Sequence, residues 1–252
     1  MTKVSELLAR PIAHRGLHDA DNSCIENTPS AIRAAVERNF AIEVDVQETA
    51  DGEALVYHDY TLDRLVQAKG PVIEKTSAEL VQLRMQTGTD NLWLLQDLFD
   101  LVAGKVPLVI EIKSRLVPGA QADFVRHVVE QVEAYDGPAC IKTFDPDMLP
   151  IARAHRPDVL RGIVADATLP EGELLRFSRI DRFIMRHMLH IPRTRPHFIS
   201  YGIRDLPSLA PGFWRRFFGL PIMTWTVRTE NQRLRAAKYA DQIVFEGFDP
   251  DA

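Results

Sequence analysis

Four short motifs in this chain combine acids, bases and carboxylates at the ends of apolar runs. Each motif follows, or lies at the tip of, a stretch typical of a buried strand, so a sheet or barrel would gather them at one edge. Histidines move protons, carboxylates hold a cation, and arginine or lysine binds an anion. The combination predicts metal-assisted phosphodiester chemistry. The motifs are His14-Arg15-Gly16, Glu43-x-Asp45, His58-Asp59 and Glu111-x-Lys113.

The spacing of Glu43 and Asp45 is informative by itself. Residues two apart on a strand point to the same face, where two bare carboxylates repel unless a cation or protons intervene. Oxygen ligands of this kind suit Mg²⁺, Ca²⁺ or Mn²⁺ better than zinc. The two cysteines, Cys24 and Cys140, match neither a zinc spacing nor a disulfide framework, which predicts free thiols.

Each of these residues also has an ordinary structural explanation. His14 alone is compatible with a hydrogen-bonded core histidine, and Glu43 with Asp45 is compatible with a solvent-facing pair. Glu111 and Lys113 are compatible with a surface ion pair, since charged residues are common where strands meet water. The conjunction of all four motifs favours a site.

Apolar, β-branched runs alternate with helical patterns along the chain, which predicts repeated βα units. We expect an α/β fold, a (β/α)8 TIM barrel, as a single domain over residues 1–252. An additional strand at 54–57 follows the turn signal Asp51-Gly52 and forms a short hairpin extension after the second strand, carrying His58 back to the mouth. The eight barrel strands are predicted at residues 11–13, 41–47, 108–112, 139–143, 160–164, 182–185, 222–227 and 242–245.

Helical patterns separate these strands. The clearest starts at Pro29, with Asn27 or Thr28 as its cap. Residues 192–196 are predicted to be a long loop, made locally basic by neighbouring arginines. Helices are predicted at 29–38, 77–83, 94–103, 120–134, 147–154, 171–177, 211–218 and 230–240.

The overall composition is that of an ordinary soluble globular protein, with 252 residues, 46% hydrophobic and 26% charged. A formal net charge of −5 gives no general attraction to nucleic acid or to an anionic membrane. No run reaches the roughly 18 apolar residues of a membrane span, and the first residues lack the apolar core of a secretory signal. We expect a cytoplasmic protein with no integral membrane association and no nucleic-acid partner; a homo-oligomer stays open.

The chain resembles the glycerophosphodiester phosphodiesterase family, in particular its small bacterial members without a large insertion domain. The similar segments follow the family order and span nearly the whole sequence, and the first four are highly specific. They are IAHRG (12–16), ENTPSAI (26–32), IEVDVQETADGEALVYHDYTLDR (42–64), IEIKS (110–114), TFDP (143–146), TWTV (224–227) and FEGFDP (245–250).

This resemblance implies a metal-dependent hydrolase that cuts a glycerophosphodiester, a small-molecule substrate, into glycerol 3-phosphate and an alcohol. It implies one divalent cation, Mg²⁺ or Ca²⁺, with Mn²⁺ as a further candidate. The implied roles are an acid/base pair, His14 and His58; metal ligands, Glu43, Asp45 and Glu111; phosphate contacts, Arg15 and Lys113; and a substrate-site tryptophan, Trp225.

Several points stay open at this level. A cyclic phosphate formed by the glycerol 2-hydroxyl and direct attack by water are both compatible with two histidines, and either histidine can be the first acid. Trp225 serves either packing or the glycerol carbons, and Glu26 and Asn27 are expected to order a loop. Lys142 stands in a strand, pointing either into the site or out of it, and has no secure family counterpart.

Two other functions compete with this interpretation. A lysophospholipase D-like enzyme would need an apolar surface, but the aromatic residues at 213–218 are expected to form core or an oligomer interface. A non-catalytic barrel that binds a phosphorylated ligand is disfavoured because both histidines and all three carboxylates are present. Arg186, His187 and Arg204 either shape substrate selectivity or serve the fold.

Overall fold

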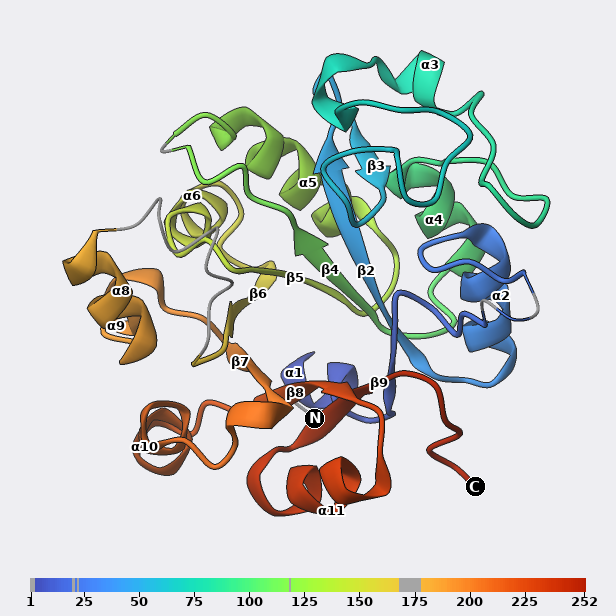
Figure 1. Cartoon of the computed structure of the whole chain (residues 1–252). Coiled ribbons are helices and arrows are strands. Elements are labelled where there is room, and N and C mark those ends of the chain that lie inside the picture. Colours follow the sequence, from blue (N-terminus) through green and yellow to red (C-terminus); the bar gives the residue numbers. More distant parts are fainter. Residues whose placement is uncertain (1–2, 20, 22, 118, 168–177) are drawn as a thin grey trace.

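The computed structural model describes residues 3–19, 21, 23–117, 119–167 and 178–252. Within these residues eight parallel strands form a closed barrel, because β1 pairs with both β9 and β2 while the other strands follow in chain order. This confirms the predicted (β/α)8 architecture (Figure 1). The strands are β1 (Ile12–His14), β2 (Ala41–Glu48), β4 (Leu108–Ile112), β5 (Ala139–Thr143), β6 (Leu160–Ala165), β7 (Phe198–Gly202), β8 (Ile222–Val227) and β9 (Gln242–Phe245).

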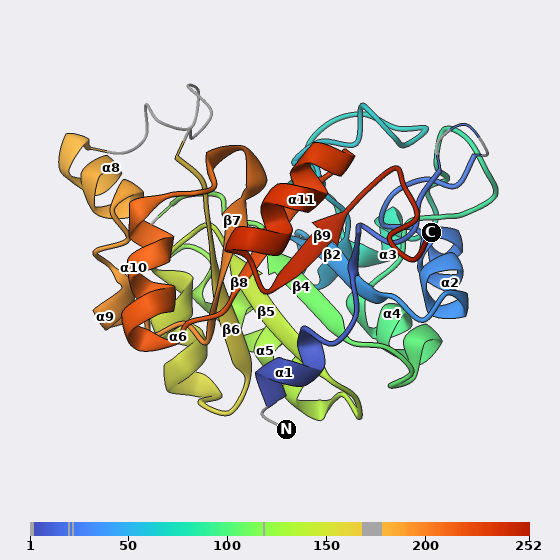
Figure 2. The same cartoon turned by 90° about the horizontal axis from the view of Figure 1, so that it is seen from below.

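The helices surround the ring of strands (Figure 1) and bury their apolar faces against it. Figure 2 shows α1 at the end of the barrel where the N-terminus lies, with α8, α9 and α10 together along one side. The helices are α1 (Lys3–Leu7), α2 (Pro29–Glu37), α3 (Ser77–Leu80), α4 (Leu95–Val102), α5 (Ala122–Ala134), α6 (Met148–His155), α8 (Arg179–Arg186), α9 (Ile191–Thr194), α10 (Leu209–Phe218) and α11 (Glu230–Tyr239), with 3-10 turns η2 (Val72–Glu74) and η3 (Ile203–Asp205).

Two local predictions near the site are confirmed. The Thr28 side chain accepts a hydrogen bond from the Ala31 amide and caps α2, with Pro29 in the first turn. β3 (Ala54–Val56) pairs antiparallel with β2 and forms the hairpin extension. Because β3 runs back along β2, the chain returns His58 to the mouth of the barrel.

The barrel interior is built in layers. Its lowest layer, which we call the apolar floor, takes one residue from each parallel strand and packs around Leu7 of α1. Side chains alternate along a strand, so the residue two positions further on also faces inward, nearer the carboxyl end. The floor consists of Ile12, Ala41, Val109, Cys140, Leu160, Phe198, Met223 and Val244.

The layer above the floor, which we call the upper layer, contains most of the polar side chains of the interior. Each of its residues stands two positions after a floor residue on the same strand. Most of these residues are ionisable or polar, whereas those of the floor are apolar. Apolar side chains therefore close the barrel below, and charged ones meet above them. The upper layer consists of His14, Glu43, Glu111, Lys142, Gly162, Ser200, Trp225 and Glu246.

One predicted strand is wrong. Residues 182–185 lie in α8, which begins with a capping box in which Ser178 and Asp181 exchange hydrogen bonds between side chain and backbone. The barrel strand is instead Phe198–Gly202, whose apolar residues are buried on both faces. The loop predicted at 192–196 is also corrected, because α9 occupies most of it. The helix predicted at 171–177 lies outside the described residues.

The aromatic residues of α10 are largely at the surface. Phe213, Phe217 and Phe218 are 49%, 69% and 61% exposed, so the expectation that they form core is wrong, while an oligomer interface stays a prediction. Trp214 is half-buried and packs against the buried apolar residues that lie between α10 and the barrel strands. Among the helices described, none has the length and apolar character needed to cross a membrane.

The β6–β7 register can be tested at Gly162, which pairs with Phe198. A Cβ on Gly162 would lie 2.0 Å from the Phe198 ring. We expect Gly162→Ala to lower the free energy of unfolding by about 1–3 kcal/mol through overpacking, and Phe198→Leu in the same chain to restore part of it. Gly212→Ala, in an open position on α10, is the control and should stabilise slightly. Chemical denaturation measures these differences; a neutral Gly162→Ala would contradict the register.

Candidate active site

A cavity of about 610 Å³ opens at the carboxyl ends of the strands, where TIM barrels carry their reactive groups. The structure brings residues from all four sequence motifs to this cavity, although they are far apart in the chain. Glu43 lies beside it and is fully buried. The lining includes His14, Arg15, Asp45, His58, Glu111, Lys113 and Trp225, together with Lys142, Phe144, Asp166 and Arg204.

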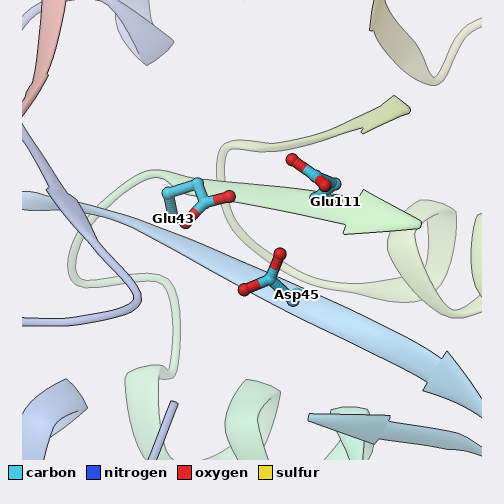
Figure 3. Close-up of side chains that lie close together, drawn as sticks. All are labelled: Glu43, Asp45 and Glu111. Atoms are coloured by element: carbon cyan, nitrogen blue, oxygen red, sulfur yellow. The ribbon is translucent and has the colours of Figure 1, made fainter. Parts of the chain in front are cut away.

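Glu43, Asp45 and Glu111 form a buried acidic cluster (Figure 3). The β2–β4 register sets Asp45 beside Glu111, and the spacing within β2 sets Glu43 on the same face. One carboxylate oxygen from each residue lies within 4.8 Å of the others. Glu43 Oε1 is buried, and the Lys142 ammonium lies 2.9 Å from it. Three converging carboxylates fit a hard divalent cation.

Three basic side chains contact the same cluster. Lys113 Nζ lies 3.1 Å from Asp45 Oδ1 and 2.8 Å from Glu111 Oε1. Lys142 Nζ lies 2.9 Å from Glu43 Oε1 and 3.0 Å from Glu111 Oε2. The Nε atom of Arg15 lies 3.3 Å from Asp45 Oδ2. The negative charges of the cluster are therefore balanced by nearby positive charges.

These contacts determine the protonation of the cluster. Burial alone would raise the pKa of Asp45, but the positive charges of Lys113 and Arg15 outweigh it and hold that pKa well below its usual range. Burial and its basic neighbours act on Glu111 in the same way and lower its pKa to about 2. Burial would lower the pKa of Lys113 and Lys142, yet the carboxylates raise both. Asp45, Glu111 and both lysines are thus charged at neutral pH.

His14 is held in one orientation by a carboxylate from the last strand. Its Nδ1 lies 2.9 Å from Glu246 Oε2, which also accepts a hydrogen bond from Arg228 at 2.8 Å. The hydrogen bond from His14 lowers the pKa of Glu246 to about 2, against the opposing effect of burial. An ionised Glu246 assigns the proton to Nδ1 and leaves Nε2, 4.0 Å from Glu43, free to accept one.

His58 has the same kind of support on the other side of the site. Its Nδ1 lies 2.7 Å from Asp59 Oδ1, and Asp59 is paired with Arg64. Burial would raise the pKa of Asp59, but its hydrogen bonds with His58 and Arg64 lower it well below its usual range. The Nε2 atom of His58 is therefore also left for chemistry.

The loop after β1 is ordered by the residues expected to order it. Glu26 accepts a hydrogen bond from Arg15 at 2.7 Å. The Asn27 side chain donates to Asp45 Oδ2 at 3.0 Å and accepts from the Asp45 amide at 3.2 Å. Gly16 has φ +80, and a Cβ there would meet Ala31 at 2.9 Å. These constraints hold the Arg15 amide 3.1 Å from Glu43 Oε2.

Trp225 forms an apolar part of the cavity wall. Its ring meets Phe144 edge to face at 5.6 Å between centroids, and its Nε1 donates to the Ser200 carbonyl at 3.2 Å. Arg204 also lines the cavity, from η3. Arg186 and His187 lie at the end of α8 instead, where the His187 ring packs on Phe183.

Sequence reasoning missed Glu246 and gave no role to Asp59, and it left the direction of Lys142 open. Glu246 immediately follows the last strand, so the strand-end argument applied to Glu111 would have found it. Lys142 lies two residues beyond the floor residue Cys140, which places it inside the barrel. The inward direction of Lys142 can be deduced only once the barrel register is known, and the sequence around Lys142 does not show it.

The fold and the site place this chain among TIM-barrel proteins with an acidic cluster able to hold a metal ion. It belongs to the glycerophosphoryl diester phosphodiesterase family, whose model matches residues 14–246. A glycerophosphodiester phosphodiesterase from Caldanaerobacter subterraneus subsp. tengcongensis is 36% identical over 129 residues, which are 47% of this chain and 52% of that relative. The match thus spans about half the length of that protein.

Solved structures named as phosphodiesterases share the fold. A Silicibacter pomeroyi protein named for the same family superposes with a TM-score of 0.78 at 24% identity, covering 96% of this chain and 93% of the other. A phosphodiesterase from Oleispira antarctica, solved with its product sn-glycerol-3-phosphate, gives 0.75 at 20% identity and covers 98% and 95%. These likenesses establish the barrel.

The Glu246 carboxylate should make stability depend on pH. Its pKa falls from 4.5 to about 2 on folding, so its stabilising effect is complete above pH 4.5 and is lost as the pH falls towards 2. We expect Glu246→Gln to lower the free energy of unfolding by about 1–3 kcal/mol near neutral pH. The difference from the unsubstituted protein should shrink below pH 4.5.

Thermal unfolding of both proteins across this pH range measures the effect. Glu37→Gln, at an exposed position on α2, is the control and should match the unsubstituted protein throughout. A Glu246→Gln difference that stays constant from neutral to acid pH would contradict the assignment of an ionised Glu246.

Proposed function

We propose that this chain is a metal-dependent glycerophosphodiester phosphodiesterase that hydrolyses its substrate to glycerol 3-phosphate and an alcohol. The observation that carries the proposal is the meeting of the acidic cluster with His14 and His58 at one cavity, each histidine with Nδ1 held by a carboxylate. Membership of the family supports it, and so does the product bound by the Oleispira antarctica phosphodiesterase.

In this proposal Glu43, Asp45 and Glu111 hold one divalent cation, Mg²⁺ or Ca²⁺, with Mn²⁺ as a further candidate. The bound ion supplies positive charge to the nonbridging phosphate oxygens, where negative charge grows during displacement. Arg15 and Lys113 line the same cavity and bind the phosphate beside it. Their contacts with the cluster hold both side chains in place before substrate arrives.

His14 and His58 move the protons. One Nε2 accepts the proton of the attacking hydroxyl, and the other histidine donates a proton to the departing alcohol oxygen. The attacking group is either the glycerol 2-hydroxyl, which gives a cyclic phosphate that water then opens, or water itself. In the two-step route the histidines exchange roles between steps. Glu246 and Asp59 stabilise each ring while it is positively charged.

Trp225, with Phe144 against it, gives the glycerol carbons an apolar wall opposite the charged residues. The apolar floor closes the barrel below the site, and substrate enters from the carboxyl-end mouth, where the cavity opens. We further propose that residues 1–252 act as one catalytic domain, in the cytoplasm, on small deacylated head-group esters. The exposed aromatics of α10 are the observation that would favour a lipid substrate instead.

An activity assay tests the proposal directly. We expect the purified chain to release glycerol 3-phosphate from glycerophosphocholine or glycerophosphoethanolamine with Mg²⁺, Ca²⁺ or Mn²⁺, and to lose this activity in excess chelator. Lysophosphatidylcholine vesicles form a separate arm, and preferential turnover there would favour the lipid alternative. No turnover with any substrate or metal would refute the enzyme assignment.

Removing either histidine should stop proton transfer without unfolding the barrel. We expect His14→Ala and His58→Ala each to lower kcat by at least about 10²-fold, as for lost general acid/base catalysis. His127→Ala, on the outer helix α5, is the matched control and should keep its activity. Initial rates give the comparison and circular dichroism checks the fold. Near-normal turnover in a folded His14→Ala or His58→Ala protein would remove that residue from the pair.

A further inference from the structure

Lys142 occupies an unusual place for a lysine. Its side chain is 3% exposed, and its ammonium group contacts two of the three carboxylates of the acidic cluster. The β4–β5 register pairs it directly with Glu111. A fully buried ammonium needs compensating negative charge, and Glu43 and Glu111 provide it.

The direction of Lys142 follows from the strand. Cys140, two residues before it, belongs to the apolar floor, so alternation sends Lys142 into the barrel as well. Ile141, between them, faces the other way and packs among apolar side chains of the surrounding helices. Turning Lys142 outward would require a shift of β5 against both neighbouring strands. The ammonium is therefore a fixed part of the acidic cluster.

The charges and contacts around the cluster show what this ammonium does. Three negative charges face the positive charges of Arg15, Lys113 and Lys142, so the cluster is close to neutral. Every carboxylate oxygen has a nitrogen neighbour, and two of the six oxygens contact the ammonium of Lys142. These are Glu43 Oε1 with Lys142, Glu43 Oε2 with the Arg15 amide, Asp45 Oδ1 with Lys113, Asp45 Oδ2 with Asn27, Glu111 Oε1 with Lys113, and Glu111 Oε2 with Lys142.

We propose that Lys142 is an internal cation that competes with the divalent ion for Glu43 and Glu111. It weakens binding of the ion by like-charge repulsion, and it keeps the carboxylates together in the metal-free protein. Folding of the barrel is then independent of the metal. With the ion bound, the retained ammonium gives the site a positive net charge, which favours an anionic phosphodiester. The inference rests on the proposed function, because it takes the same three carboxylates as ligands.

The test compares metal affinity and metal-free stability in charge-removing variants. Lys142→Met and Lys142→Gln should each bind Mg²⁺ and Ca²⁺ at least about tenfold more tightly in calorimetric titration. In chelator, both variants should unfold at a lower temperature than the unsubstituted protein, since three carboxylates then share fewer positive neighbours. Added Mg²⁺ should raise their unfolding temperature by more than it raises that of the unsubstituted chain.

Three further proteins make the result specific. Lys105→Met, at an exposed position in the loop before β4, makes the same substitution far from the cluster and should change neither quantity. Lys142→Arg keeps the charge and should stay within about threefold of the unsubstituted affinity. Glu43→Gln should weaken the titration, which assigns the measured binding to this cluster.

The outcomes separate the inference from the proposed function. Unchanged affinity and unchanged metal-free stability in Lys142→Met and Lys142→Gln would overturn the role of Lys142 while leaving the enzyme assignment intact. A variant that folds only with Mg²⁺ supports the role, because the ion then replaces the ammonium. A variant that folds under neither condition overturns it. An unsubstituted chain with no saturable metal binding and no chelator-sensitive turnover would count against the proposed function itself.

Discussion

The site depends on one geometric constraint, the alternation of side chains along the strands of a closed barrel. Each parallel strand contributes an apolar residue to the floor and, two positions later, a residue to the upper layer. Because apolar side chains close the interior below, the charged groups of the upper layer face one another. A one-residue shift of any strand would exchange its interior and exterior side chains, so the register of the whole barrel holds the chemistry in place.

Enclosing so many charges requires that they neutralise one another. An isolated buried carboxylate would be protonated or would destabilise the fold, whereas Asp45 and Glu111 stay ionised because basic groups contact them. The same pairing orients the cluster, since each carboxylate is held by donors from two or more elements. The same contacts thus balance the charges and position the three carboxylates as a cluster able to hold a metal ion.

The two histidines show the same principle at the edge of the cluster. Each ring has Nδ1 hydrogen-bonded to a carboxylate, and each carboxylate is held by an arginine, Arg228 for Glu246 and Arg64 for Asp59. One support comes from the end of the last strand and the other from the residue next to His58. Different parts of the chain therefore give both histidines the same tautomer and a fixed orientation.

The sequence by itself determined the chemical inventory and the barrel, because strand-end motifs, apolar runs and cap residues are local features with local physical causes. It predicted that the three carboxylates and both histidines meet at the mouth of the barrel, and it placed seven of the eight barrel strands close to their observed positions. Only the tertiary structure decided the rest. Residues 182–185 and 198–202 both look strand-like locally, and the capping box at Ser178 together with packing against β6 and β8 selects the second. The partnership of Glu246 with His14, and that of Lys142 with Glu43, join residues more than 90 positions apart, and such contacts exist only once the barrel closes.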